Sequence, residues 1–139
     1  MIRKEAQMPV SYEERLKNGV GVVRLSHILE VERAYGAGRL FAVSSIPPGG
    51  SIGRHRHEGD FEIYYILRGS ALVTDGDGAE DTLGPGDSMV CFDGDEHSIA
   101  NAGDSDLEYI AFILYSQNGI AARKRDEGGA RTAERENNE

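Results

Sequence analysis

Residues 49–69 read GGSIGRHRHEGDFEIYYILRG, a histidine pair and a short turn followed by a strongly apolar strand. His55 and His57 are two residues apart, so on a strand both imidazoles leave the same face. A hairpin through the turn-like residues 58–60 would then bring Glu62 back beside the two histidines. A carboxylate inside so apolar a strand must be paired, hydrogen-bonded or bound to a metal ion.

A third imidazole comes from far along the chain. His97 directly follows the turn sequence DGDE at residues 93–96, so it can enter the same site from another strand. Two imidazoles from one strand, a carboxylate from the next and a distant third imidazole can converge on one divalent ion. Each of these residues alone also fits a surface or core role, and only their joint spacing favours a metal site.

The surrounding sequence is typical of an all-β domain. From residue 38 onward, short runs such as LFAVSSI, SALVT and DSMVCF alternate with turn sequences such as PPGG, DGDG and LGPGD. Thirteen of the 18 glycines lie in residues 36–103, where tight turns are expected. The pattern predicts an antiparallel sandwich or barrel.

In these residues the chain resembles the cupin family. The first cupin motif is a glycine, five residues, His-X-His, three or four residues, Glu, six residues and a glycine. Its positions here all match, and they are Gly49, His55, His57, Glu62 and Gly69. The second motif is a glycine, five residues, proline, one residue, glycine, two residues, histidine, three residues and asparagine. Its positions here match except that Phe92 replaces the proline, and they are Gly86, Phe92, Gly94, His97 and Asn101.

The resemblance implies a small antiparallel jelly-roll β-barrel with a metal ion at its centre. The implied metal ligands are His55, His57, Glu62 and His97. Nitrogen and oxygen ligands without thiolate admit one divalent transition metal ion, with Mn, Fe, Ni or Zn, and also Co or Cu, left open. Tyr64 should share the face of Glu62 and line the cavity, either as the catalytic acid/base group or as a packing aromatic.

Three residues near the motifs are expected to have structural roles. Asn101 should stabilise a turn, and Cys91 should be a buried thiol rather than a metal ligand. His27 lies outside both motifs, and we expect it to pack in the core or to lie at the surface.

Two short segments flank the expected barrel. In residues 1–37, the capping-box pattern SYEE and a following Asn-Gly predict a short N-terminal helix over about residues 12–17. The apolar residues 20–31 predict one or two strands, which in cupins often pair with a second subunit, so a homodimer is expected. Residues 38–115 would form the barrel, and residues 116–139 a polar tail that is either a frayed helix or disordered.

Charge and composition exclude several partners. Fifteen Lys and Arg residues against 24 Asp and Glu residues give a formal net charge of −9, and an acidic surface repels the phosphate backbone of nucleic acids. No apolar run approaches the roughly 18 residues of a membrane-spanning helix. The N-terminus does not resemble a signal peptide, and a single cysteine fits a reducing compartment. We therefore expect a cytoplasmic protein without nucleic-acid or membrane partners.

The leading functional hypothesis is a metal-dependent enzyme that acts on a small oxygen-rich molecule. Open positions on the ion permit Lewis-acid chemistry, as in lyases, decarboxylases and isomerases, or oxygen chemistry, as in dioxygenases. The alternatives are a non-catalytic module that binds a metal or small ligand and a scaffold with a vestigial site. The fold does not choose among these activities.

Overall fold

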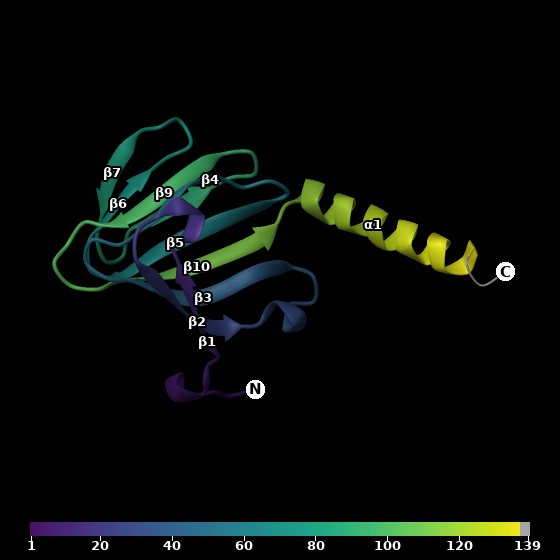
Figure 1. Cartoon of the computed structure of the whole chain (residues 1–139), viewed down its shortest axis with the longest axis horizontal. Coiled ribbons are helices and arrows are strands. Elements are labelled where there is room, and N and C mark those ends of the chain that lie inside the picture. Colours follow the sequence, from purple (N-terminus) through teal and green to yellow (C-terminus); the bar gives the residue numbers. More distant parts are fainter. Residues whose placement is uncertain (137–139) are drawn as a thin grey trace.

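The computed structural model describes the backbone of residues 1–136 and the side chains of residues 1–129, arranged as two β-sheets and one long helix (Figure 1). The strands are β1 (Val10–Glu14), β2 (Val22–Leu29), β3 (Gly38–Ile46), β4 (Ser51–Arg56), β5 (Asp60–Arg68), β6 (Ala71–Thr74), β7 (Glu80–Leu83), β8 (Ser88–Cys91), β9 (Glu96–Asn101) and β10 (Leu107–Tyr115). The helical elements are α1 (Gln117–Glu136) and the short 3-10 helices η1 (Glu5–Gln7), η2 (Leu16–Asn18) and η3 (Val31–Arg33).

The strands form a six-stranded sheet in the order β1-β2-β3-β10-β5-β8 and a four-stranded sheet in the order β4-β9-β6-β7. Every strand pairing within the described residues is antiparallel. Neighbours such as β3 and β10, or β4 and β9, are far apart in sequence, because the chain passes repeatedly between the two sheets. The predicted all-β antiparallel jelly-roll fold is therefore confirmed, although its strands form two sheets rather than one closed barrel.

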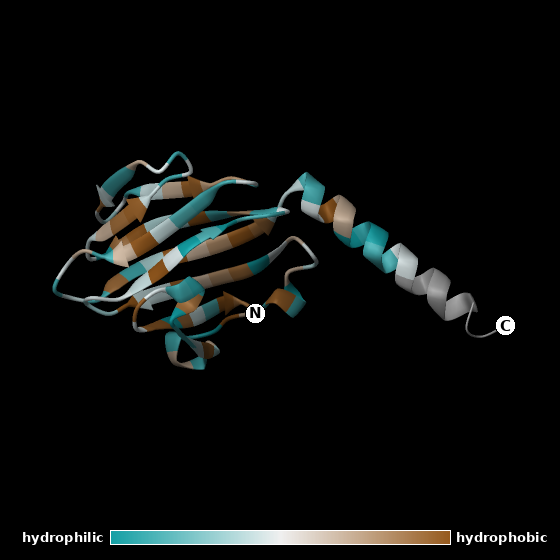
Figure 2. Ribbon diagram, turned by 45° about the horizontal axis from the view of Figure 1, so that its top comes forward, coloured by the Kyte–Doolittle hydropathy of each residue, from teal (hydrophilic) through white to brown (hydrophobic). Residues whose placement is uncertain are grey.

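The core lies between the inner faces of the two sheets. Along β5 burial alternates residue by residue, so that Glu62, Tyr64 and Ile66 are buried and their neighbours are more exposed. Figure 2 shows the same alternation as bands of hydrophilic and hydrophobic residues along the strands. Inward side chains of both sheets, including Ile46 and Ile99, join in one apolar cluster. The two sheets are thus held together by a shared core, and the candidate site residues of β5 point into it.

The N-terminal segment differs from its prediction. The short helix expected over about residues 12–17 is wrong, because Val10–Glu14 is strand β1 and Tyr12 lies opposite Arg24 of β2. So short a helix is marginal on its own, whereas pairing with β2 satisfies backbone groups along β1. The extended segment predicted in residues 20–31 is confirmed as β2, which lies between β1 and β3 of the same chain.

Helix α1 leaves the end of β10 and extends away from the sheets (Figure 1). Its start is fixed by Ser116, whose hydroxyl donates to Asp93 Oδ2 at 2.7 Å and accepts from the Gly119 amide at 3.2 Å. Residues 117–136 thus adopt the helical alternative for the predicted tail, and residues 137–139 of that tail lie outside the described residues. The division into three segments stays a prediction.

Across the described part of the chain, no helix has both the length and the apolar character that a membrane crossing requires.

Candidate metal centre

Three histidines and one glutamate converge between the two sheets. In the ladder between β4 and β9, His55 lies directly opposite His97, and their Nε2 atoms are 3.0 Å apart. His57 directly follows the last residue of β4, and its Nε2 lies 3.1 Å from that of His97. Together with Glu62, these residues offer four candidate ligand atoms that all lie within 4.8 Å of one another.

Backbone hydrogen bonds between the two motifs position His57. Its amide donates to the Asp95 carbonyl at 3.0 Å, and its own carbonyl accepts from the Gly94 amide at 2.7 Å. Gly94 has a φ of +92°, in the left-handed region that favours glycine, so the turn before His97 depends on this residue type. The spacing within each motif therefore decides how the two histidine strands meet.

Glu62 reaches the cluster from the opposite sheet. The hairpin expected through residues 58–60 is wrong, because β4 belongs to the four-stranded sheet and β5 to the six-stranded sheet. The turn carries the chain across the core instead, and Gly59 in it has a φ of +77°. Glu62 Oε1 nevertheless lies 3.1 Å from His97 Nε2 and 3.3 Å from His57 Nε2, so the carboxylate and the imidazoles meet as the spacing predicts.

The orientation of the imidazoles fits a bound cation. The His57 Nδ1–H donates to Asp60 Oδ1 at 2.6 Å and the His55 Nδ1–H donates to the Gly53 carbonyl at 2.8 Å, so the Nε2 atoms of both rings face the centre. Bonds of about 2.1 Å from one ion to adjacent ligands place the ligand atoms on the order of 3 Å apart. Four of the six separations among the ligand atoms, at 3.0 to 3.3 Å, match that spacing, and all six are within 4.8 Å, so the residues can come together around a divalent ion.

The pKa values of the cluster residues are compatible with a bound cation. Burial would raise the pKa of Glu62, but hydrogen bonds with His57 and His97 outweigh it and lower the pKa to about 2. Burial lowers the pKa of His55, which keeps this imidazole neutral. Burial acts in the same direction on His57, but Glu62 and Asp60 outweigh it and raise the His57 pKa. A carboxylate and at least one neutral imidazole are thus available for a cation.

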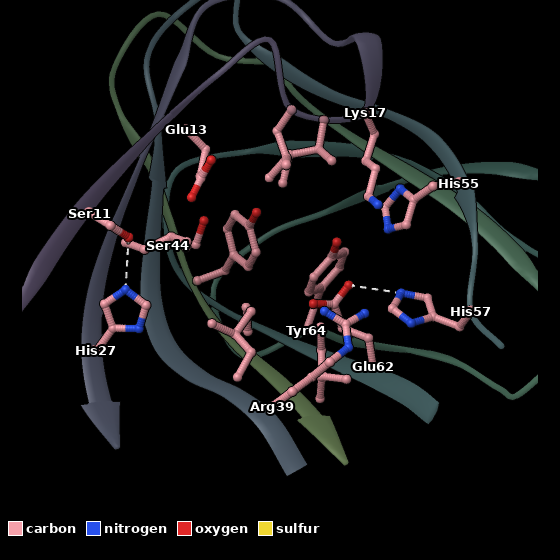
Figure 3. Close-up of a pocket in the computed structure, with 17 residues that line it drawn as sticks. Ser11, Glu13, Lys17, His27, Arg39, Ser44, His55, His57, Glu62 and Tyr64 are labelled. Atoms are coloured by element: carbon pink, nitrogen blue, oxygen red, sulfur yellow. Dashed lines mark hydrogen bonds and ion pairs between the residues drawn. The ribbon is translucent and has the colours of Figure 1, made fainter. Parts of the chain in front are cut away.

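A cavity of about 320 Å³ adjoins the cluster, and Tyr64 lines it as the sequence predicts (Figure 3). The Tyr64 ring stacks on His97 with centroids 4.9 Å apart, and its hydroxyl lies 3.5 Å from His97 Nε2. Burial raises the pKa of the Tyr64 phenol well above its ordinary range. Tyr64 therefore holds its proton beside the cluster and is a donor at neutral pH.

The motifs do not identify two charged residues that support the cluster. Asp60, which sequence analysis places in a turn, is buried and bridges His57 and Arg39, whose Nε donates to Asp60 Oδ2 at 2.6 Å. Like Glu62, Asp60 is an acidic residue in an otherwise apolar strand, and this feature is visible in the sequence. Arg39 also lines the cavity, but it lies far from both motifs in sequence and carries no comparable signal.

The remaining sequence-predicted residues lie outside the cluster. Cys91 is buried, with its thiol 3.5 Å from the Asp95 carbonyl, and burial raises its pKa to about 12. The Asn101 side chain donates to the carbonyls of Ile46, at the end of β3, and of Ser105, in the turn before β10, in agreement with a turn-stabilising role. His27 is hydrogen-bonded to Ser11 at 2.8 Å and lines the cavity away from the cluster, which was not predicted.

Comparison with known proteins finds a matching family model and similar proteins for this chain. Residues 42–113 match the family model described as the cupin domain. A Thermotoga maritima protein named oxalate-binding protein is 40% identical over 116 residues, which cover 82% of this chain and 93% of that protein.

Two solved structures have the same fold. A crystal structure from Thermotoga maritima, described as a predicted oxalate decarboxylase, has a TM-score of 0.79 and 37% identity, and the match covers 84% of this chain and 100% of that chain. The cupin domain of Cnp3 from Schizosaccharomyces pombe has a TM-score of 0.64 over 84% of this chain and 74% of that chain. At 13% identity, the second structure is evidence for the fold alone.

Proposed function

Because this chain belongs to the cupin family, we propose that it is a metal-dependent enzyme that acts on a small oxygen-rich acid such as oxalate. His55, His57, Glu62 and His97 would hold one divalent transition metal ion. The observation that carries the proposal is the convergence of these four side chains beside a cavity large enough for a small molecule. The descriptions of the Thermotoga maritima protein and crystal structure support oxalate as the first substrate to test.

The residues around the cluster suit an anionic substrate. Arg39 and Lys17 bring positive charge to the cavity wall, and Lys17 points toward the histidines in Figure 3. The apolar side chains of Leu25 and Ile52 line the same cavity and limit the access of water. When bound, the ion would supply a positive charge that binds carboxylate oxygens and stabilises negative charge in the transition state.

Decarboxylation is the reaction class that we favour. In oxalate it breaks the carbon–carbon bond and releases CO₂, and the remaining carbon takes a proton to become formate. Tyr64 is the group that we propose for proton transfer, because its protonated hydroxyl lies beside the cluster. The dioxygenase alternative predicts oxygen consumption instead of formate.

A non-catalytic role in binding oxalate is the second candidate function. The name of the 40% identical relative favours it, since that protein is named for binding and not for a reaction. Both candidates share the metal site and differ only in turnover.

The test starts from protein purified without an affinity tag or chelator. Elemental analysis should find one divalent ion per chain and identify it among Mn, Fe, Ni and Zn, and oxalate should then be converted to formate and CO₂. His57→Ala should lose both the metal and the activity. Oxalate binding without turnover would support the second candidate, and metal-free protein with unchanged activity would refute the metal site.

We also propose that the protein is a cytoplasmic homodimer. β2 pairs on both sides within its own chain, so it is not free to pair with a second subunit. The outer face of the six-stranded sheet offers an alternative contact, because Phe41, Phe112 and Ile63 lie side by side on β3, β10 and β5. The two phenyl rings are 4.6 Å apart, and neighbouring Tyr65 is 44% exposed. Light scattering at micromolar concentration should give twice the mass of the chain, and a monomer would contradict the proposal.

A further inference from the structure

The cavity beside the metal cluster has a second polar end. Two residues that bear hydroxyl groups line it there, Ser44 on β3 and Tyr109 on β10, and they lie opposite each other in the ladder between the two strands. Both residues are fully buried. In Figure 3 Ser44 lies across the cavity from His57, so this end is separate from the cluster.

Neither hydroxyl group makes a hydrogen bond of normal length within the described residues, although the two lie close enough for Ser44 to lower the pKa of Tyr109. Buried polar atoms are nearly always paired in native proteins, so an unpaired hydroxyl calls for a partner from outside the fold. Burial raises the pKa of the Tyr109 phenol, with the nearby Ser44 hydroxyl opposing part of that rise, so Tyr109 is a donor at neutral pH. Because both residues line the cavity, a molecule bound there can supply the missing hydrogen-bond partner.

Other groups at this end favour a hydroxyl over a carboxylate as that partner. Across the six-stranded sheet, Ser11, Leu25 and Ser44 lie in one register row with Tyr109. Glu13 is two residues after Ser11 on the same strand, and it also lines the cavity. A negative side chain disfavours a second anion, whereas a hydroxyl can accept from Tyr109 or Ser44 and also donate to a carboxylate.

The cluster end has the opposite character. Arg39 is linked through Asp60 to His57 and so lies near the cluster, and Lys17 points toward it. Much of the remaining cavity lining is apolar and includes Leu25, Ile52 and Ala111. The cavity of about 320 Å³ is at the lower end of the size range of small-molecule sites and is larger than a two-carbon acid needs.

We propose that the cavity binds a polyhydroxy acid longer than oxalate, with its carboxylate at the metal cluster and a distal hydroxyl on Ser44 and Tyr109. The carboxylate end rests on the function proposed above, whereas the hydroxyl end rests on Ser44 and Tyr109 alone. Oxalate fills only the first of these two ends.

The test compares three acids on protein loaded with Mn²⁺. Glycolate carries only a chelating 2-hydroxycarboxylate, L-threonate adds distal hydroxyls to the same group, and L-malate adds a distal carboxylate. Titration calorimetry should show that L-threonate binds about tenfold more tightly than glycolate, since each hydrogen bond contributes a factor of roughly two to ten. L-malate should bind no better than glycolate.

One double variant and one control variant assign the gain to the hydroxyl pair. Ser44→Ala combined with Tyr109→Phe should reduce the affinity for L-threonate to that for glycolate, while the melting temperature reports whether the core is intact. Tyr65→Phe removes an exposed tyrosine hydroxyl outside the cavity, and it should leave all three affinities unchanged. Elemental analysis of every sample separates loss of the metal from loss of the distal contact.

Three results would overturn the inference. These are equal affinity of the wild type for L-threonate and glycolate, a gain that survives in the double variant, and tighter binding of L-malate than of L-threonate. Each of them leaves the proposed metal site intact, whereas wild-type protein that takes up no Mn²⁺ or other divalent ion overturns that site and this inference together.

Discussion

The two sheets of this protein differ in the side chains that they carry on their inner and on their outer faces. The four-stranded sheet turns His55 and His97 inward, and its outer face carries the Arg54–Glu96 ion pair at 2.6 Å. The six-stranded sheet turns oxygen-bearing groups inward, Glu62 and Tyr64 among them, and its outer face is apolar around Phe41 and Phe112. The imidazoles of the cluster thus come from the four-stranded sheet and its edge, and the carboxylate and phenol beside them come from the six-stranded sheet.

Because of this difference, metal binding depends mainly on one sheet and substrate contacts depend mainly on the other, around one shared cavity. The histidines lie on or next to two strands that are hydrogen-bonded to each other, so their positions depend on backbone pairing in the small sheet. The groups that would meet a substrate lie on strands of the large sheet. We therefore expect loss of a cluster histidine to abolish metal binding. On the six-stranded sheet Glu62 and Asp60 also act on the metal, and the other substitutions are expected to change chemistry, affinity or association.

The largest effect is expected for His97→Ala on the four-stranded sheet. His97 Nε2 lies within 3.1 Å of His55 Nε2, His57 Nε2 and Glu62 Oε1, so it contacts each of the other three residues of the cluster. The bound ion should fall from one per chain to near zero by elemental analysis. His27→Ala is the matched control, because His27 lines the cavity away from the cluster, and it should keep the metal. Full metal content in His97→Ala would refute the site.

The second largest effect is expected for Tyr64→Phe, which should lower turnover and leave metal binding nearly unchanged. The phenol is the donor beside the cluster, and removing a proton-transfer group lowers kcat by about 10²- to 10⁴-fold. The affinity for the metal should change by less than about threefold, because the ring and its stacking on His97 remain. Steady-state kinetics and metal titration measure the two quantities. If kcat is unchanged, Tyr64 is a packing aromatic, which is the alternative left open by the sequence.

Asp60→Asn should weaken metal binding without abolishing it. Asp60 accepts the Nδ1–H of His57 at 2.6 Å and so orients this imidazole from the six-stranded sheet. Loss of such a partner typically costs 10- to 100-fold in metal affinity. Competition with a metal-binding dye should measure this loss for Asp60→Asn and no loss for Asp81→Asn on β7, which is exposed. A variant with wild-type affinity would show that the His57 ring is held by backbone contacts alone.

The outer faces provide a smaller test of the same comparison. Tyr65 on the six-stranded sheet and Leu72 on the four-stranded sheet are exposed to similar extents, 44% and 38%. Tyr65→Glu should convert the proposed homodimer into a monomer, because it places a charge in the apolar outer face. Leu72→Glu should leave the dimer intact. Light scattering distinguishes these results, and the reverse pattern would assign the interface to the other sheet.

The sequence predicts the cluster better than the fold that surrounds it. The spacing of His55, His57, Glu62 and His97 brings the four residues together correctly, although the chain crosses between sheets where a hairpin is expected. The crossing is not predictable from spacing, because a short turn containing Gly59 fits either connection. The N-terminal helix fails for a related reason, since the capping-box pattern is local whereas the pairing of β1 with β2 is not.

The second polar end of the cavity could not be predicted from one sequence. Ser44 and Tyr109 lie in strands at opposite ends of the barrel sequence, and they meet only because β3 and β10 are neighbours. Neither residue belongs to a motif, and a serine or a tyrosine in a strand is ordinary. Arg39 and Asp60 are similar, because their ion pair joins the start of β3 to the start of β5, two strands that are separated in the sheet by β10. The spacing of residues along the sequence does not reveal which distant strands pair or in which register.

The smallest effect is expected at the outer face of the four-stranded sheet. Hydrogen bonding from Arg54 lowers the pKa of Glu96 below 4.5, so the ion pair contributes fully above pH 4.5 and is lost as the pH falls through the lowered pKa. In Arg54→Gln the Glu96 pKa should rise toward 4.5, which NMR titration of the carboxyl carbon measures. The change in melting temperature should be the smallest of the series and should shrink at about 0.5 M salt, because the pair is exposed and screened. Loss of metal in this variant would show that the outer face also positions His97, and the separation of tasks between the two faces of this sheet would then fail.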